Sequence, residues 1–231
     1  MVTIAFDGDG TIWDCRREWY DTASEAWFTI EKTEFPMGYE RFNEFIWSVV
    51  RPEHIMQNAK LASMNITLPT NINDLVKLRS MFDVFDYVNA FYNCRQKAMK
   101  DKENWLKKHK LYEGVTDMFK SLEKVRTNNV VVTSKDGTST TELLKYFDID
   151  KFIDEIYSKE LGGRQEQFRC LSAKHKDHIV VYDDMPENLE VAKSFGFIPI
   201  AAPQGYSRQS DLAEYVTASP HEFVRIIRGL I

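Results

Sequence analysis

Cysteine is scarce in this chain of 231 residues. There are only three cysteines, an odd number, and they lie far apart in the sequence. Cys15, Cys94 and Cys170 show no CxxC spacing. A disulfide framework uses an even number of cysteines and forms in an oxidising compartment. We therefore predict three free thiols and a protein of the reducing cytoplasm.

Long hydrophobic runs are missing as well. The apolar run at residues 2–6 is too short for the core of a signal peptide, and acids follow it immediately. No other run approaches the roughly 20 apolar residues that are needed to cross a bilayer. We therefore expect neither a secretory signal nor a membrane protein.

The chain also lacks a strong charge of one sign and a cluster of histidines. Its formal net charge is −5, and its lysines and arginines are spread along the sequence. This distribution argues against a general nucleic-acid binder, which needs a concentrated basic surface. The five histidines show no metal-ligand spacing, so we interpret them as surface or packing residues.

What the chain does contain is enough for a sizeable core, with 43% hydrophobic residues. Short apolar runs show the continuous Val/Ile pattern of strands that are buried on both faces. These predicted strands are residues 2–6, 130–133, 179–182 and 197–201, with a weaker one at 155–158. Helices are expected at 115–125, 140–147, 166–174 and 188–195, and after a capping box at 219–222. This alternation predicts a doubly wound, Rossmann-like α/β fold with a parallel sheet.

Residues 15–111 break the alternation, because they have almost no β-branched runs and form helix-like segments. These expected helices are residues 17–32, 39–50 and a long stretch at 73–109, with a loop at 64–71. We therefore predict two domains. Residues 1–14 and 112–231 form an α/β core, and residues 15–111 form an inserted all-helical cap.

The strongest predicted strands end in acids or hydroxyls. Asp7, Asp9 and Thr11 follow the first strand, residues 133–135 follow the second, and residues 183–184 follow a later one. Ligands of open α/β sheets bind beyond the carboxyl ends of the strands. Carboxylates and hydroxyls without histidine predict a hard-cation site, and Mg²⁺ suits carboxylates together with water and phosphate oxygens.

Three motifs, taken in order, resemble those of the haloacid dehalogenase (HAD) superfamily. DGDGT at 7–11 is similar to the family's DxDGT motif and follows a hydrophobic strand. VVVTSK at 130–135 resembles the second motif, a strand that ends in Thr or Ser. VVYDDMPENLEVAKSFGF at 180–197 resembles the fourth motif in its two-aspartate form. The resemblance covers the whole predicted core and implies a helical cap between motifs one and two.

The resemblance implies roles for the residues that match these motifs. Asp7 is the expected nucleophile, which takes a phosphoryl group to form an aspartyl-phosphate. Asp9 is expected to protonate the leaving group and then to activate the attacking water. Thr133 is the expected hydrogen-bond donor to the phosphoryl oxygens, and Ser134 is either a second one or an ordinary loop hydroxyl. Because dehalogenases lack an acid at the place of Asp9, the resemblance favours phosphate chemistry.

The resemblance also implies a Mg²⁺ site. Its expected ligands are Asp7 and Asp184, with Asp9 and Asp183 as further candidates. Asp183 fits equally well as an acid that contacts the metal ligands and not the metal itself. The metal offsets the repulsion among these carboxylates and neutralises charge on the transferred group.

Two positions depart from the family's pattern. The third motif is usually a lysine at the start of the helix before the fourth strand, where this sequence has Arg164 as a candidate phosphate-binding residue. Lys159 and Lys174 are the alternatives for that role. Gly8 stands where a bulky apolar residue is common, which frees space near the nucleophile. Lys135, which follows the second motif, we interpret as a solvated charge.

These motifs predict a Mg²⁺-dependent phosphohydrolase that cleaves a small phosphomonoester, with the helical insertion enclosing the substrate. The predicted partner is therefore a small phosphorylated metabolite. A phosphomutase with the same acids is one alternative. A catalytically weak relative that acts as a binding or regulatory protein is another, and Arg164 is the feature that favours it.

Overall fold

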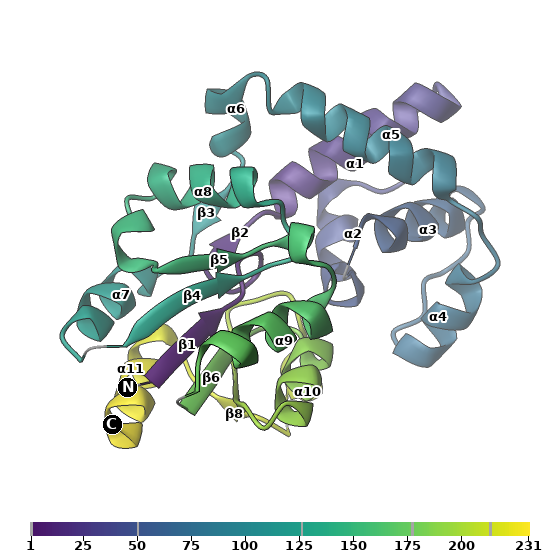
Figure 1. Ribbon diagram of the computed structural model, residues 1–231. Helices are drawn as coiled ribbons and strands as arrows, with labels where there is room; N and C mark the ends of the chain where they lie inside the picture. The colour runs from purple at the N-terminus through teal and green to yellow at the C-terminus, as the bar shows by residue number, and fades with distance from the viewer. Residues whose placement is uncertain (1, 50, 126, 177, 213) are drawn as a thin grey trace. The chain divides into compact units, whose positions relative to one another are not determined.

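The computed structural model describes residues 2–49, 51–125, 127–176, 178–212 and 214–231, and the chain divides into two compact units. Met1–Asp14 and Lys110–Ile231 form one of them, the core unit. Cys15–His109 form the other, the helical unit. Figure 1 shows both, coloured along the chain.

The core unit is built on a parallel sheet of six strands in the order β5-β4-β1-β6-β7-β8 (Figure 1). The strands are β1 Val2–Phe6, β4 Asn128–Val132, β5 Glu155–Tyr157, β6 His178–Asp183, β7 Ile198–Ala201 and β8 Val216–Thr217. The chain runs outward from β1 to β5, then crosses back to β6 and continues to the other edge. This order confirms the predicted doubly wound α/β fold. The sequence pattern does not predict β8, because two residues carry no periodicity.

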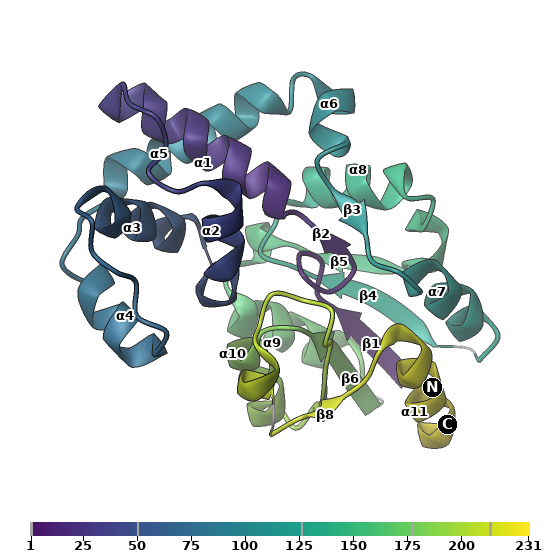
Figure 2. The same cartoon turned by 180° about the vertical axis from the view of Figure 1, so that it is seen from behind.

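Helices cover both faces of this sheet. They are α7 Val115–Glu123, α8 Gly137–Tyr146, α9 Arg164–Lys174, α10 Pro186–Ser194 and α11 Pro220–Leu230, with short 3-10 turns at Asp150–Phe152, Lys159–Leu161 and Gln209–Leu212. In Figure 1, α9 and α10 lie over one face, and Figure 2 shows α7 and α11 over the other. Each predicted helix is present. α8, α9 and α10 begin two or three residues earlier than predicted, because their first turns contain few apolar residues.

Side chains from both faces of the sheet are buried against these helices. On one face, Phe168 and Leu171 of α9 and Leu189 of α10 belong to one apolar cluster with strand residues such as Val181. On the other, the ring of Phe6 packs edge-on against Phe119 at 5.0 Å and Phe223 at 5.8 Å. Because the strands are covered on both sides, they show continuous apolar runs instead of alternation.

The last helix begins with the predicted capping box. The Ser219 side chain accepts a hydrogen bond from the Glu222 backbone N–H, and the Glu222 carboxylate accepts one from the Ser219 backbone. Two free N–H groups at the helix start are thereby satisfied. The box thereby stabilises the first turn of α11.

A short antiparallel ribbon lies where the chain leaves and re-enters the core unit. It pairs β2 Trp13–Asp14 with β3 Lys110–Leu111. Two-residue strands give no sequence signal, so neither is predicted. The ribbon places Trp13 directly after the first motif, where it is completely buried.

The helical unit contains no strand among its described residues. Its helices are α1 Arg16–Glu31, α2 Tyr39–Glu44, α3 Pro52–Ser63, α4 Ile72–Arg79, α5 Phe85–Ala98 and α6 Lys102–Leu106, with a 3-10 turn at Ile46–Ser48. The prediction of one long helix at 73–109 is wrong. Asp83 and Asp101 accept hydrogen bonds from the backbone N–H groups of Phe85 and Asn104, so new helices begin there.

The predicted helix at 39–50 is also shorter than expected, since α2 ends at Glu44 and the 3-10 turn follows. Its last residue, Val50, lies outside the described residues. The predicted loop at 64–71 is confirmed. None of the helices in the described ranges combines the length and the apolar character needed to cross a membrane.

Candidate active site

Three buried carboxylates meet at the carboxyl edge of the sheet. Phe6, the last residue of β1, is paired with Tyr182 of the adjacent β6, so the chain emerges from both strands at the same level. Asp7, Asp183 and Asp184 therefore converge, and their nearest carboxylate oxygens all lie within 4.8 Å of one another. Asp9 is not a member of this cluster.

Burial and mutual repulsion raise the pKa of these acids. Burial raises the pKa of Asp7 well above its usual value, and the neighbouring charge of Asp183 raises it further. Burial and the charge of Asp183 raise the pKa of Asp184 to about 7. Both causes penalise the ionised carboxylates, and a bound cation would remove the penalty. A set of buried carboxylate oxygens is a donor set that fits a hard divalent ion such as Mg²⁺.

Hydrogen bonds orient the two acids at the end of β6. Asp183 accepts from the Met185 backbone N–H at 2.8 Å and from the Asn188 side chain at 3.1 and 3.0 Å. Asp184 accepts from the Thr11 hydroxyl at 3.2 Å and from the Tyr206 backbone N–H at 2.7 Å. The Asn188 side chain thus helps to fix the orientation of Asp183.

Two glycines make room for the Asp184 carboxylate. Gly10 has φ +92°, and a Cβ there would lie 2.5 Å from one Asp184 oxygen. A Cβ on Gly205 would lie 2.1 Å from the Cβ of Asp184. The loop that carries Gly205 and Tyr206 is therefore part of the site. The sequence analysis does not identify it, because Gly205 is distant from every recognised motif.

Arg164 lies beside the candidate nucleophile. Its Nη2 atom is 2.7 Å from Asp7 Oδ1 and 3.4 Å from Asp183 Oδ2, and its Nη1 donates to the carbonyl oxygen of Val132. Burial alone would lower the pKa of Arg164, but the charges of Asp7 and Asp183 outweigh it and raise the pKa. The structure thus brings Arg164 to the carboxylates, as expected for a third-motif cation.

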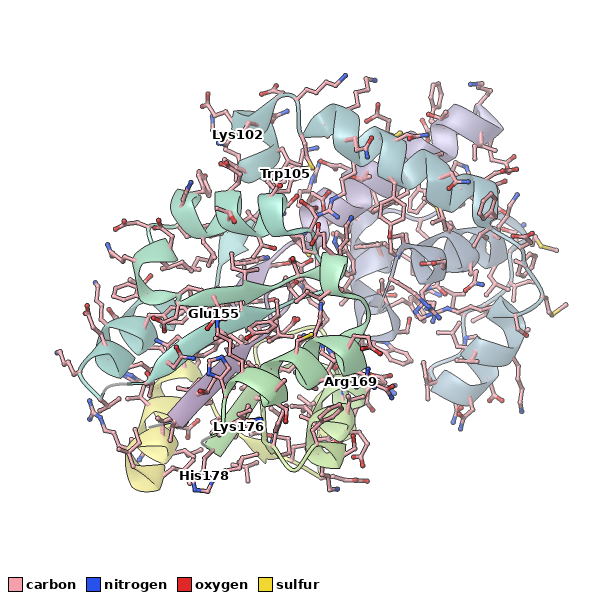
Figure 3. The ribbon with its side chains drawn as sticks, in the orientation of Figure 1. Lys102, Trp105, Glu155, Arg169, Lys176 and His178 are labelled. Carbon is pink, nitrogen blue, oxygen red and sulfur yellow. The ribbon has the colours of Figure 1, made fainter. Side chains whose placement is uncertain are left out.

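One of the two lysines named as alternatives is engaged elsewhere. Lys174 ends α9, and its Nζ is 2.5 Å from a carboxylate oxygen of Glu155, which is labelled in Figure 3. Lys159 lies in the exposed 3-10 turn before α9. Neither forms an ion pair with Asp7 among the interactions of the described residues, whereas Arg164 does.

Thr133 lies directly after β4 and is buried next to the first motif. Its Oγ1 accepts a hydrogen bond from the Lys135 backbone N–H at 3.1 Å. A Cβ on Gly8 would lie 3.4 Å from the same oxygen, so the Thr133 hydroxyl is close to the residue after Asp7. Ser134, by contrast, is exposed.

Asp9 is held by two residues outside the acidic cluster. Trp13 Nε1 donates to Asp9 Oδ1 at 2.5 Å, and Lys135 Nζ lies 3.1 Å from Asp9 Oδ2. The interpretation of Lys135 as a solvated charge is wrong, since only 2% of the residue is exposed. A loop lysine is normally solvated, but here the charge of the partly buried Asp9 compensates that of Lys135. The position of Lys135 at the end of the VVVTSK segment is the signal that could have revealed its contact with the site.

The absence of a side chain at Gly8 has a local explanation. A Cβ there would lie 2.8 Å from Cζ2 of Trp13, closer than real side chains approach. The Trp13 ring also stacks on Phe147, with the centroids 6.3 Å apart. The space near the nucleophile that Gly8 leaves is therefore filled by an indole.

Solved structures share this fold over nearly the whole chain. A protein assigned as a phosphatase from Clostridium difficile has 20% identity and a TM-score of 0.72, covering 98% of this chain and 97% of that one. One assigned as a phosphoglycolate phosphatase from Haemophilus somnus has 15% identity and a TM-score of 0.71, covering 97% of both chains. One assigned as a β-phosphoglucomutase from Thermotoga maritima has 15% identity and a TM-score of 0.64, covering 100% of both. At these identities the likeness is one of fold.

Comparison with curated proteins gives no significant match. The family described as haloacid dehalogenase-like hydrolase, however, matches residues 4–166, more than half of the chain. The matched range begins in β1, includes Asp7 and Asp9, and ends just after Arg164. The chain therefore belongs to the haloacid dehalogenase-like hydrolase family, as its motifs predict.

Proposed function

We propose that this hydrolase is a Mg²⁺-dependent phosphatase that cleaves small phosphomonoesters through an aspartyl-phosphate on Asp7. The observation that carries the proposal is the surroundings of Asp7. Arg164 lies 2.7 Å from one of its oxygens, and Asp183 and Asp184 lie in the same cluster. Asp7 can attack an anionic phosphate in these surroundings, because Arg164 supplies a fixed positive charge and the other two acids supply oxygens that can bind a metal.

Asp7, Asp183 and Asp184 would hold the Mg²⁺, because their carboxylate oxygens converge and burial raises the pKa of all three groups, a penalty on ionisation that a bound cation would relieve. When bound, the ion would neutralise charge on the transferred phosphoryl group. The Asn188 and Tyr206 hydrogen bonds would keep Asp183 and Asp184 oriented whether or not a metal is present.

In the first half of the reaction, an Asp7 oxygen attacks phosphorus and the bond from phosphorus to the leaving oxygen breaks. The Asp9 carboxyl group gives its proton to that oxygen, which departs as an alcohol. Arg164 and the Thr133 hydroxyl donate hydrogen bonds to the phosphoryl oxygens as charge shifts onto them. The products are the alcohol, the aspartyl-phosphate on Asp7 and an ionised Asp9.

In the second half, water attacks the phosphorus of the aspartyl-phosphate. The Asp9 carboxylate takes a proton from this water, and the bond between phosphorus and Asp7 breaks. Inorganic phosphate leaves, Asp7 is an ionised carboxylate again, and Asp9 is protonated for the next cycle. One residue thus serves as acid and then as base.

The helical unit would act as a cap that selects the substrate, because every residue given a chemical role belongs to the core unit. The similar structures assigned as a phosphatase and a phosphoglycolate phosphatase support a small phosphorylated substrate. The structure assigned as a β-phosphoglucomutase supports the alternative of a phosphomutase, which would use the same acids.

The variant Asp7→Asn tests the proposal. An amide fills the same volume but does not attack phosphorus, so phosphate release from a panel of phosphorylated metabolites should fall below detection. Asp117→Asn, at an exposed position of α7, is the matched control and should keep wild-type turnover. Retention of a tenth of wild-type activity by Asp7→Asn would exclude Asp7 as the nucleophile.

Metal removal tests the role of the acidic cluster. Turnover should vanish in excess chelator and return with Mg²⁺, and Mg²⁺ should raise the melting temperature of the wild-type protein, since it binds the folded state. Asp184→Asn should reduce that rise. Turnover that persists in chelator would exclude the metal.

Phosphorus NMR on a phosphorylated sugar separates hydrolysis from phosphomutase activity. A phosphatase yields inorganic phosphate, whereas a mutase yields the sugar phosphorylated at a different oxygen. Absence of both products from every substrate in the panel would favour a binding or regulatory protein.

A further inference from the structure

We propose that Trp13 and Lys135 are positioning residues that hold the Asp9 carboxylate in place for proton transfer to the leaving group. This inference rests on the proposed function, in which Asp9 is the acid of the first half-reaction. Trp13 lies outside the recognised motifs, and Lys135 is the last residue of the VVVTSK segment, to which the resemblance gives no role. Both reach Asp9 from different segments of the core unit.

The two residues contact different oxygens of the same carboxylate. Trp13 Nε1 lies 2.5 Å from Oδ1, and Lys135 Nζ lies 3.1 Å from Oδ2. The terminal torsion of an aspartate is broad when nothing restrains it. A hydrogen-bond donor at one oxygen and a cation at the other restrict that rotation, so the carboxyl plane of Asp9 points in one direction.

Trp13 is suited to this task because it is rigid. Its side chain is completely buried, stacks on Phe147 and lies in β2, which pairs with β3. The indole N–H is a donor only, so Trp13 orients Asp9 without competing for its proton. A serine or tyrosine hydroxyl in the same place would both donate and accept.

Lys135 joins the acid to the phosphate-binding turn. Its backbone N–H donates to Thr133 Oγ1 at 3.1 Å, while its side chain lies at Asp9. The following residue, Asp136, caps α8 by accepting from the Ser139 backbone N–H at 2.8 Å. The Lys135 backbone is thus fixed on both sides, and the Asp9 carboxylate is tied to the start of α8.

Gly8 completes the arrangement by giving the indole its space. The Trp13 ring atom Cζ2 would lie 2.8 Å from a Cβ at position 8. Any larger residue at position 8 would push the ring away and move Nε1 off Asp9. Gly8 and Trp13 are therefore coupled, because the large side chain at position 13 occupies the space that a side chain at position 8 would need.

The leaving group offers a readout that loss of packing alone would not produce. An alkoxide is a poor leaving group and needs a proton as the bond to phosphorus breaks, whereas a nitrophenolate leaves well without one. Substitutions that misplace Asp9 should therefore slow an alkyl phosphate more than p-nitrophenyl phosphate. The ratio kcat/KM is the right measure, because it reports the steps up to the first release and excludes hydrolysis of the aspartyl-phosphate.

The experiment compares Trp13→Phe and Lys135→Met on the two kinds of phosphomonoester. Each variant should lose about 10- to 100-fold in kcat/KM on an alkyl phosphate, which is part of the roughly 100- to 10,000-fold contribution of general acid catalysis, and about threefold or less on p-nitrophenyl phosphate. Trp105→Phe is the matched control. Trp105, labelled in Figure 3, is buried in the helical unit, and its Nε1 has no hydrogen-bond partner among the described residues.

Equal losses on both substrates would overturn the inference, because they would assign Trp13 and Lys135 to phosphate binding or folding. Unchanged activity on both would overturn it as well. Absence of phosphate release by the wild-type protein would instead contradict the proposed function.

A measurement without turnover tests the contact itself. The indole N–H proton of Trp13, assigned in the NMR spectrum by its loss in Trp13→Phe, should shift upfield in Asp9→Ala when its acceptor is removed. The indole proton of Trp105 should not move. An unchanged Trp13 resonance would show that the indole does not hold Asp9.

Discussion

Arg164 in the core unit and Arg79 in the helical unit are two arginines with little solvent exposure, and their surroundings differ. In the core unit, Arg164 faces the carboxylates of Asp7 and Asp183. In the helical unit, Arg79 donates to the Asn58 side chain at 2.9 Å and to the carbonyl and hydroxyl oxygens of Ser48 at 2.8 and 2.7 Å. Among its described neighbours, Arg79 forms no ion pair with a carboxylate.

The difference appears in the pKa values of the two guanidinium groups. Burial lowers the pKa of Arg79 to about 10, because no anion offsets the loss of water. The same burial acts on Arg164, but the neighbouring carboxylates reverse its effect and raise the pKa. Arg79 joins three segments of the helical unit by donating hydrogen bonds to neutral oxygens. Arg164 instead compensates the negative charge of carboxylates at the point where an anionic substrate would react.

Among the substitutions that test this comparison of the two units, Arg164→Ala should have the largest effect. Removing one preorganised donor costs roughly 2–4 kcal/mol of transition-state stabilisation. We therefore expect kcat/KM for a phosphomonoester to fall about 30- to 1,000-fold. Arg164→Lys should recover part of the loss, since it restores the charge without the planar fork.

Lys159→Ala and Lys174→Ala are the controls for this prediction, and both should stay close to wild type. Near-normal turnover of Arg164→Ala with collapse of one lysine variant would transfer the role to that lysine. Near-normal turnover of all three would mean that the site works without a cation at this position.

Arg79→Met should have the opposite signature, with a loss of stability instead of catalysis. The Ser48 and Asn58 oxygens would lose their donors in a buried place, so the free energy of unfolding should drop by about 2–3 kcal/mol. Urea denaturation measures the change, and turnover of p-nitrophenyl phosphate per folded molecule should remain at the wild-type level. A stable variant with low turnover would instead assign Arg79 to substrate binding.

A smaller loss of stability should come from Ser219→Ala, at the start of α11 in the core unit. Removing the capping hydroxyl costs about 1 kcal/mol, because the Glu222 backbone N–H loses its acceptor. The expected result is a lower melting temperature with unchanged kcat. A fall in kcat would show that α11 influences the acids across the sheet. The distinction between residues that act on catalysis and residues that act on stability would then be weaker.

The smallest effect should come from Arg17→Ala, at an exposed arginine of the helical unit. Its guanidinium is 2.9 Å from Asp21 and lies over the Tyr39 ring at 5.3 Å. A contact between this exposed guanidinium and an anionic substrate should be worth about 1 kcal/mol at most, so ratios of kcat/KM among metabolites should change by about two- to fivefold. Equal losses on every substrate would place Arg17 in folding or in the common chemistry.

The sequence predicts the elements of the core unit well, because each carries its own local signal. Continuous Val and Ile runs mark the strands, and Ser219 with Glu222 marks the last helix start. The short strands β2, β3 and β8 have no such signal. In the helical unit, the breaks at Asp83 and Asp101 depend on single side chains that accept from the backbone, which apolar periodicity does not register.

For the candidate site, the order of motifs in the sequence alone determined which acids follow the strands, and it made Arg164 a candidate for the cation before the last motif. Only the tertiary structure decided which of them meet. It joined Asp7, Asp183 and Asp184 in one cluster and assigned Asp9 to Trp13 and Lys135. The physical reason is that spacing along a strand determines where a residue emerges, whereas the ion pairs of Arg164 with Asp7 and of Lys135 with Asp9 join segments far apart in the chain.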